Sequence, residues 1–266
     1  MSIGRKILLL GLFPGVMLLA GCAILPPPAA TLQERAALAP TGKLRVGVYL
    51  GSPTSLVMDA SGKKAGVAYE LGREFARWLN VPFEPVEYRG IVDVVEAVNK
   101  GQVDFTFTIA TPSRANSMNL SQSMLHLEMG YLVPVGSQFQ NANEIDRAGV
   151  KVGVVQGGTT QGVLMSTYKQ ASVLPLPTLK VAFEGLAQGK FDAFTANKGI
   201  LFQLSDELPG ARVLEGRWGL ENLAIGIPKG REMGMPYVNR FAQSVRHDGL
   251  LQAVINRAGL RGTVEP

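Results

Sequence analysis

The stretch from Thr106 to Arg114, which reads T-F-T-I-A-T-P-S-R, contains the residue types best suited to hold a charged ligand. Apolar side chains occupy every second position before and within it, which predicts a buried strand over Val103–Ile109. Thr111 followed by Pro112 is typical of a helix N-cap and a first helical residue. Arg114 would then lie in the first turn, where the helix dipole disfavours a cation. Either an anion is held between Arg114, hydroxyl groups and free N–H groups, or Arg114 pairs with a surface carboxylate.

The N-terminus has the features of an export signal. Arg5 and Lys6 precede an apolar run that is too short for a membrane-spanning helix and ends at Gly21-Cys22. The pattern resembles the lipobox of bacterial lipoproteins, whose cysteine is lipidated and becomes the first residue of the mature protein. Residues 1–21 are therefore expected to be removed. Acyl chains on Cys22 would anchor an extracytoplasmic, periplasmic domain to a membrane surface.

The composition argues against nucleic acid, metal ions and cofactors as partners. The formal net charge is +5, and two of these charges, Arg5 and Lys6, belong to the signal, so the mature part carries +3. This excess is too small to indicate nucleic-acid binding. Cys22 is the only cysteine, so no disulfide within the chain is possible. The two histidines are far apart and have no second ligand nearby, so neither a metal site nor another cofactor is predicted.

Strands and helices are expected to alternate after a proline-rich linker over residues 22–40. Strands are predicted over Leu44–Tyr49 and Phe83–Tyr88, and helices over Ala68–Leu79 and from Ile91 to Gly101. Glu70 and Arg73 are expected on the solvated face of the first helix. This alternation favours an α/β class with parallel strands covered by helices. The length is sufficient for two lobes with separate cores.

The second half of the chain partly repeats the first. A strand with the pattern Val-Gly-Val occurs in both halves, and a Gly-x-apolar-Asp unit follows later in both, with Asp104 and Asp192 interpreted as structural. Each Val-Gly-Val strand leads into a glycine- and hydroxyl-containing loop, Gly51-Ser52-Pro53-Thr54 or Gly157-Gly158-Thr159-Thr160. Ligands of α/β sheets bind outside the carboxyl ends of the strands. Two facing lobes would therefore place both loops and Arg114 around one cleft.

Taken in order, these segments resemble the extracytoplasmic solute-binding proteins of polar amino-acid ABC importers, family 3. The resemblance runs from about Lys43 to Gly259 and is carried by segments that include Gly101-Gln102-Val103-Asp104, Thr111-Pro112-Ser113-Arg114-Ala115, Val152-Gly153-Val154-Val155-Gln156-Gly157-Gly158-Thr159-Thr160 and Ile225-Gly226-Ile227-Pro228-Lys229-Gly230. It implies an α/β fold of the two-lobed periplasmic-binding-protein type II. Each lobe would be a mixed, mostly parallel sheet flanked by helices, and two hinge strands would join the lobes.

The same resemblance implies the bounds of the lobes and the roles of residues. Lobe 1 would span 41–128 with 222–266, and lobe 2 would span 129–221, with hinges near Leu127–Gly130 and Trp218–Asn222. Arg114 matches the arginine that grips the ligand α-carboxylate, and Thr159 matches the lobe 2 hydroxyl that donates to it. The full predicted ligand-binding set is Ser52, Thr108, Thr111, Arg114, Gly158, Thr159, Thr160 and Asn197. No catalytic residue is predicted.

The sequence departs from the family pattern at two places that would contact the ligand outside its carboxylate. Asn197 stands where the family usually has an aspartate for the ligand ammonium, and an amide cannot neutralise a buried cation. The aromatic residues that usually sandwich the ligand are replaced by Gly51-Ser52-Pro53-Thr54 and Ile91. An amino acid, a small anion without a free ammonium and a degenerate pocket therefore all stay open.

Three functions follow from this reading. The leading one is a lipid-anchored receptor that closes its lobes on a small carboxylate-bearing solute and docks on an ABC permease. The second is a sensor or adaptor domain of the cell envelope with a degenerate pocket and an exposed apolar patch. The third is an enzyme similar to cyclohexadienyl dehydratases of the same fold family, in which Glu128 or Glu184 would have to serve as the general acid.

Overall fold

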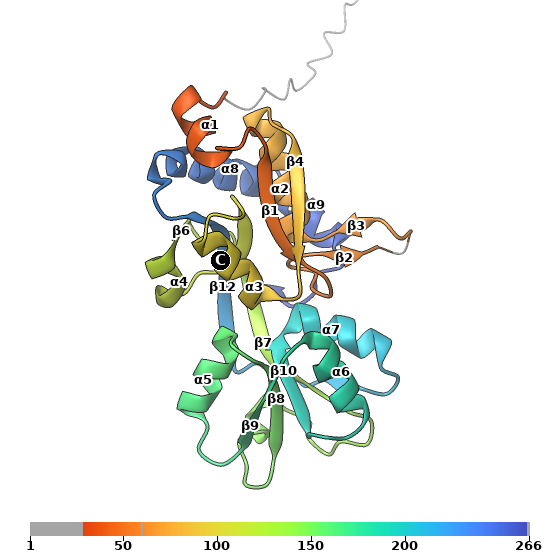
Figure 1. Ribbon diagram of the computed structural model, residues 1–266. Helices are drawn as coiled ribbons and strands as arrows, with labels where there is room; N and C mark the ends of the chain where they lie inside the picture. The colour runs from red at the N-terminus through yellow and green to blue at the C-terminus, as the bar shows by residue number, and fades with distance from the viewer. Residues whose placement is uncertain (1–28, 60, 265–266) are drawn as a thin grey trace, which may run out of the picture.

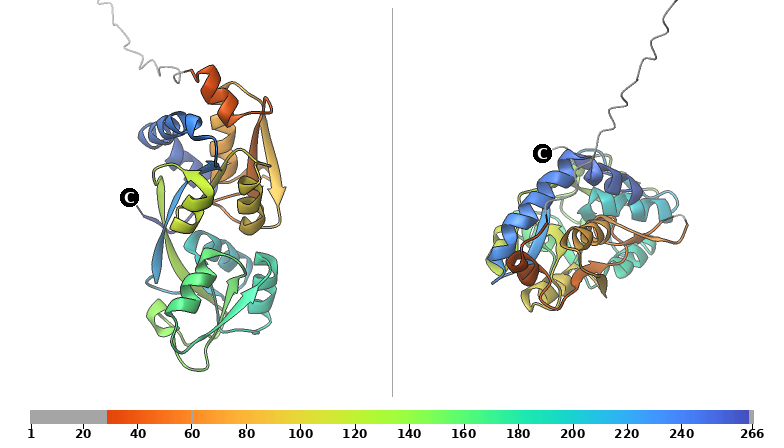
Figure 2. Two further views of the ribbon diagram at one scale, coloured as in Figure 1. Left: turned by 60° about the vertical axis from the view of Figure 1, so that its left-hand side comes forward. Right: turned by 90° about the horizontal axis from the view of Figure 1, so that it is seen from above.

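The computed structural model describes residues 29–59 and 61–264, so the predicted signal, residues 1–21, and Cys22 lie outside the described residues. Two lobes lie one above the other (Figure 1), and a second view shows that the N-terminal and C-terminal parts of the chain share the upper lobe (Figure 2). Two strands, β7 (Leu125–Val133) and β12 (Gly219–Pro228), connect the lobes. The predicted two-lobed α/β fold is confirmed, and the residue bounds of the lobes stay a prediction.

The sheet of the upper lobe contains the strands that the sequence pattern predicts. β1 (Leu44–Tyr49) pairs in parallel with β4 (Phe83–Tyr88), and a parallel bridge from Val46 to Phe105 connects β1 to the strand that follows. That strand, β5 (Thr106–Ile109), is antiparallel to β12. It is shorter than predicted because the backbone N–H of Asp104, before the strand begins, donates a hydrogen bond to the carbonyl of Arg45.

Helices cover the upper sheet on two faces. α2 (Val67–Leu79), α8 (Met235–His247) and α9 (Leu250–Arg257) share one apolar core, while α3 (Ile91–Asn99) contributes to a smaller core. The prediction that α2 ends at Leu79 is confirmed. The expectation of a solvated Glu70 is wrong, because Glu70 is buried and accepts a hydrogen bond from Arg257 Nε at 2.7 Å. The shorter elements are α4 (Pro112–Ser117), β2 (Val57–Met58), β3 (Lys64–Ala65), β6 (Met118–Leu120), β13 (Thr263–Val264) and the 3-10 turn Glu232–Gly234.

The chain is already folded before β1. α1 (Leu32–Leu38) begins with a capping box, in which Thr31 and Glu34 each accept a hydrogen bond from the other's backbone N–H. Leu38 is fully buried in the large upper core, and Arg240 of α8 donates to Glu34 at 2.7 Å. Within residues 29–59 and 61–264, no helix has the length and apolar character needed to span a membrane.

The strands of the lower lobe continue the sheet that contains β5 and β12, while the apolar cores of this lobe are its own. Its strands follow the order β7–β10–β8–β9, in which β8 (Lys151–Val155) is parallel to β9 (Ser172–Leu176) and to β10 (Ala193–Asn197). The remaining elements of this lobe are α5 (Thr159–Thr167), α6 (Leu179–Ala187), α7 (Lys198–Glu207), β11 (Arg212–Val213) and the 3-10 turn Ala142–Glu144. Two apolar clusters fill this lobe and are separate from the upper cores, as predicted.

The short sequence repeats mark equivalent places in the two lobes. Asp104 accepts a hydrogen bond from Arg45 N at 2.9 Å, and Asp192 accepts one from Lys151 N at 2.7 Å. In both cases an aspartate fixes the start of a central strand, β1 or β8. The structural interpretation of both aspartates is therefore confirmed. In both lobes the carboxyl end of this strand, β1 or β8, points toward the region between the lobes.

Candidate functional site

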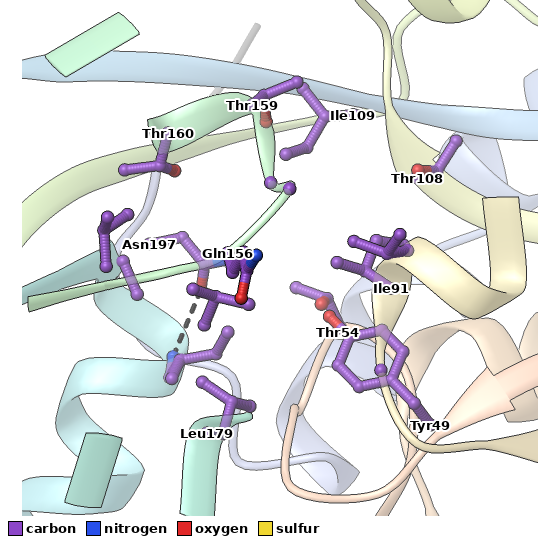
Figure 3. A pocket seen from close by; sticks show the side chains of 18 of the residues that line it. Tyr49, Thr54, Ile91, Thr108, Ile109, Gln156, Thr159, Thr160, Leu179 and Asn197 are labelled. Atoms are coloured by element: carbon purple, nitrogen blue, oxygen red, sulfur yellow. Dashed lines mark hydrogen bonds between the residues drawn. The ribbon is translucent and has the colours of Figure 1, made fainter. Parts of the chain in front are cut away.

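A cavity of about 530 Å³ lies between the two lobes and the connecting strand β12. Figure 3 shows Tyr49, Thr54, Ile91 and Thr108 of the upper lobe on one side and Thr160, Asn197 and Leu179 of the lower lobe on the other. The lining further includes Phe107, Arg114, Gln156, Gly157, Gly158, Thr159, Thr178, Thr195, Glu221 and Leu223. Both predicted loops thus contribute to one cleft.

Arg114 is the buried cation among the described residues that line this cavity, whereas Arg89 is exposed and pairs with Asp93. Thr111 caps α4 by accepting from Arg114 N at 3.2 Å, which positions the arginine in the first turn of the helix. Its Nη1 donates to Thr108 Oγ1 and to the carbonyl of Ile109. In the described part of the chain, Nη2 and Nε donate to no protein atom and the side chain forms no ion pair. The surface ion-pair interpretation is therefore wrong.

Burial determines the electrostatics of the Arg114 guanidinium. Arg114 is only 8% exposed, and desolvation lowers the pKa of its side chain, while the charges of Glu221 and Tyr49 act in the opposite direction. A guanidinium that is held on one side and free on the other can give two parallel charge-assisted hydrogen bonds to a carboxylate. The arrangement favours an anionic ligand group at this end of the cavity.

The start of α5 faces the cavity from the lower lobe. Gly157 adopts a φ of +73° in the loop after β8, and Gly158 is the N-cap residue of α5 but supplies no side-chain cap. Among the described residues, the first-turn N–H groups of Thr159 and Thr160 have no side-chain acceptor that caps them. A helix N-terminus with free N–H groups and hydroxyl side chains is complementary to an anion.

Asn197 lies at the end of β10 and already has a structural task. Its Oδ1 accepts a hydrogen bond from Ile200 N at 3.1 Å and thereby caps α7. The remaining polar group on its side chain is the NH₂, which donates and does not accept. Asn197 can therefore offer the cavity only its NH₂ group as a hydrogen-bond donor, because its oxygen is used to cap α7.

Two members of the predicted set lie outside this cavity. Ser52 is fully buried, its Oγ lies 2.8 Å from Thr54 Oγ1, and it is Thr54 that reaches the lining. Thr111 lines an adjoining cavity of about 410 Å³ next to Tyr131 and Trp218. The structure thus brings together Thr108, Arg114, Gly158, Thr159, Thr160 and Asn197, with Thr54 in place of Ser52.

Glu221 is the site residue that the sequence analysis missed. It lies on β12 and lines both cavities, and its Oε2 is buried and has no hydrogen-bond partner in residues 29–59 and 61–264. Burial raises the pKa of its carboxyl to about 7, and the charge of Arg114 opposes this rise. The signal was the alternation in β12, since Glu221 has the parity of the buried residues Leu223 and Ile225.

The two glutamates considered as general acids lie elsewhere. Glu128 accepts from Lys198 at 2.6 Å and from Arg217 at 2.7 Å, and these partners hold the pKa of its carboxyl below the usual value. Glu184 is an exposed residue of α6 next to Lys180. Neither is among the residues that line the cavity, so neither is placed to act as the general acid that the enzyme hypothesis would require.

We expect Glu221→Gln to change how stability depends on pH. The carboxyl has a pKa of 4.5 in the unfolded chain and about 7 in the fold, so its favourable contribution is complete below pH 4.5 and is lost as pH rises through 7. The loss should amount to about 3 kcal/mol or less. The ligand-free wild-type protein should therefore melt at a lower temperature at pH 8 than at pH 5, by a margin that the neutral glutamine reduces. Melting curves of both proteins at the two pH values measure this, and equal pH dependence would contradict it.

Two α/β lobes joined by two strands around an inter-lobe cavity are the architecture of type II periplasmic binding proteins. The family model for bacterial extracellular solute-binding proteins, family 3, matches residues 44–259, and the chain belongs to this family. The cysteine receptor structure of Neisseria gonorrhoeae superposes with a TM-score of 0.74 at 24% identity, covering 84% of this chain and 92% of that one.

Two curated relatives are similar in sequence. A glutamine-binding protein of Geobacillus stearothermophilus is 24% identical over 194 residues, which is 71% of this chain and 73% of that protein. A membrane-bound lytic murein transglycosylase F of Aeromonas salmonicida is 33% identical over 108 residues, which is 39% of this chain and 21% of that protein.

Proposed function

We propose that this chain is the receptor of an ABC importer and closes its two lobes on a small solute that bears a carboxylate. The observation that carries the proposal is Arg114, a buried guanidinium in the inter-lobe cavity whose Nη2 and Nε have no partner among the described residues. The names of the glutamine-binding and cysteine-receptor relatives agree with an amino acid or a related anion.

Closure would arise from contacts that only the closed form makes. The carboxylate binds first to Arg114 in the upper lobe, and Thr159 and Thr160 at the start of α5 then donate from the lower lobe. A ligand shifts a conformational equilibrium only through such differential contacts. The strands β7 and β12 are the hinge elements that would allow the lobes to approach, and the closed form would dock on the permease.

A thermal-shift panel tests the proposal. The chain without its first 22 residues is heated with amino acids, keto acids, dicarboxylates and small anions, each far above micromolar concentration. One chemical class should stabilise the protein by a few kcal/mol, and Arg114→Ala should remove the shift. A folded protein that no carboxylate stabilises would exclude the receptor function.

A second candidate is an adaptor or sensor domain of the envelope. It is favoured by the similarity of part of this chain to part of a lytic transglycosylase, a protein whose name describes no transport. The side-chain oxygen of Asn197 caps α7, which agrees with a pocket that differs from the usual pocket of the family. If no compound in the thermal-shift panel stabilises the protein, this candidate is favoured over the receptor.

The anchor requires a separate experiment because Cys22 lies outside the described residues. We propose that acyl chains on Cys22 hold the protein on a membrane. In cells that express the full chain, Cys22→Ser should move the protein from the membrane fraction to the soluble fraction. A serine variant that stays with the membranes would contradict lipid anchoring.

A further inference from the structure

We propose that Glu221, on the connecting strand β12, receives the ammonium group of an amino-acid ligand in this protein, in place of the aspartate that Asn197 replaces. The inference deepens the proposed receptor function and rests on it. It selects ligands that carry an amino group as well as a carboxylate, and it assigns the amino group to a residue outside the predicted set.

The cavity contains two opposite charges that do not pair with each other. Arg114 uses only Nη1 within the described protein, and Oε2 of Glu221 is buried without a partner. The two residues influence each other electrostatically but form no hydrogen bond or ion pair. Separated, unpaired charges in one buried site are costly to maintain. A molecule with a carboxylate at one end and an ammonium a short distance away satisfies both.

Other lining residues cannot take the ammonium in this way. Among the described lining residues, two carry carboxylates, Asp93 and Glu221. Asp93 already accepts from Arg89 Nε at 2.8 Å at the rim of the cavity. Asn197 has its oxygen engaged by Ile200 N and presents a donor instead. Glu221 is the remaining acceptor with a formal negative charge.

The position of Glu221 suits a ligand held by both lobes. β12 runs from one lobe to the other, and Ala110 N, in the loop that leads to Arg114, bonds to Asn222 O next to Glu221. This bond fixes the backbone next to Glu221 relative to the segment that leads to α4. A backbone that is ordered before a ligand arrives limits the ordering cost of binding.

The assignment has a consequence for pH. The titratable and charged groups on the elements around Glu221 are Tyr49 on β1, Arg89 and Asp93 at α3, Arg114 in α4, His126, Glu128 and Tyr131 on β7, and Tyr168 after α5. Of these, Arg114 acts on the Glu221 carboxyl, whose pKa burial raises to about 7. An ammonium ligand requires the ionised form. Its affinity should therefore be about tenfold weaker at pH 6 than at pH 8.

The test compares ligand pairs that differ at the amino group. Full-length protein, expressed with its leader and purified in detergent, is titrated calorimetrically with common L-amino acids and with the 2-hydroxy acid of the same side chain, for example alanine with lactate. The wild-type protein should bind one amino acid at least 100-fold more tightly than its hydroxy counterpart. Glu221→Gln should weaken that amino acid at least 30-fold and leave the hydroxy acid unchanged. Glu207→Gln, an exposed glutamate on α7, is the matched control and should bind like the wild type.

The outcomes separate this inference from the receptor function. If a hydroxy or keto acid binds as tightly as the amino acid, needs Arg114 and is insensitive to Glu221→Gln, the ammonium assignment is overturned and the receptor function stands. If no compound binds the wild-type protein, both are overturned. The comparison of ligand pairs on the wild-type protein needs no variant, so a poorly folding variant would not prevent a decision.

Discussion

Replacement of Arg114 by alanine is expected to weaken the carboxylate ligand by about 100-fold to 1,000-fold, since removing one partner of a buried charge pair costs about 2–5 kcal/mol. The guanidinium donates to Thr108 and to the carbonyl of Ile109, and its two other nitrogens have no acceptor in the described part of the chain. Arg114→Lys should also lose much of the affinity, because an ammonium cannot replace a planar fork that serves both the protein and the ligand.

The loss can be assigned to the site with a matched control. Arg147→Ala removes an exposed arginine in the lower lobe that lines neither cavity. It should leave the dissociation constant unchanged in the same calorimetric titration. Equal affinities of the Arg114→Ala and wild-type proteins would mean that the ligand carboxylate is bound elsewhere.

Asp104→Asn is expected to destabilise the fold by about 3–5 kcal/mol, the typical cost of breaking a buried ion pair. The carboxylate of Asp104 is fully buried and accepts from Arg45 N at 2.9 Å, from Arg45 Nε at 2.9 Å and from Nη2 at 2.6 Å. Arg231 Nη1 adds a bond at 2.5 Å. An asparagine would present an NH₂ group to these donors and would leave two guanidinium groups without their anion.

The lower lobe provides the control at the equivalent position. Asp192 is exposed and accepts a single hydrogen bond, from Lys151 N, so Asp192→Asn should cost only about 1 kcal/mol. Urea unfolding of both variants, followed by circular dichroism, measures the difference. Similar small losses for the two variants would show that the guanidinium partners of Asp104 contribute little.

Local patterns predicted the elements that carry their own signals. The alternation over Leu44–Tyr49, the helical spacing up to Leu79 and the Thr111-Pro112 cap all correspond to the observed elements, because each depends on neighbouring residues. The placement of Arg114 in the first turn of α4 followed from the cap. The position of Arg114 in the candidate site was therefore accessible from the sequence.

Residues whose environment comes from distant segments were not predicted correctly. Glu70 is buried because Arg257, far along the chain, folds onto it. Glu221 belongs to the site only because β12 passes between β5 and β7, a pairing that no local pattern encodes. Ser52 was predicted to line the cavity but is fully buried beside Thr54, because its position depends on how the loop after β1 packs.

Small-angle X-ray scattering with and without the compound that the thermal-shift panel identifies tests the central claim most directly. A receptor that closes on a carboxylate held by Arg114 should show a smaller radius of gyration at saturating ligand, and Arg114→Ala should keep the ligand-free value at the same concentration. A radius of gyration that does not change while the wild-type protein is saturated would contradict closure around this site.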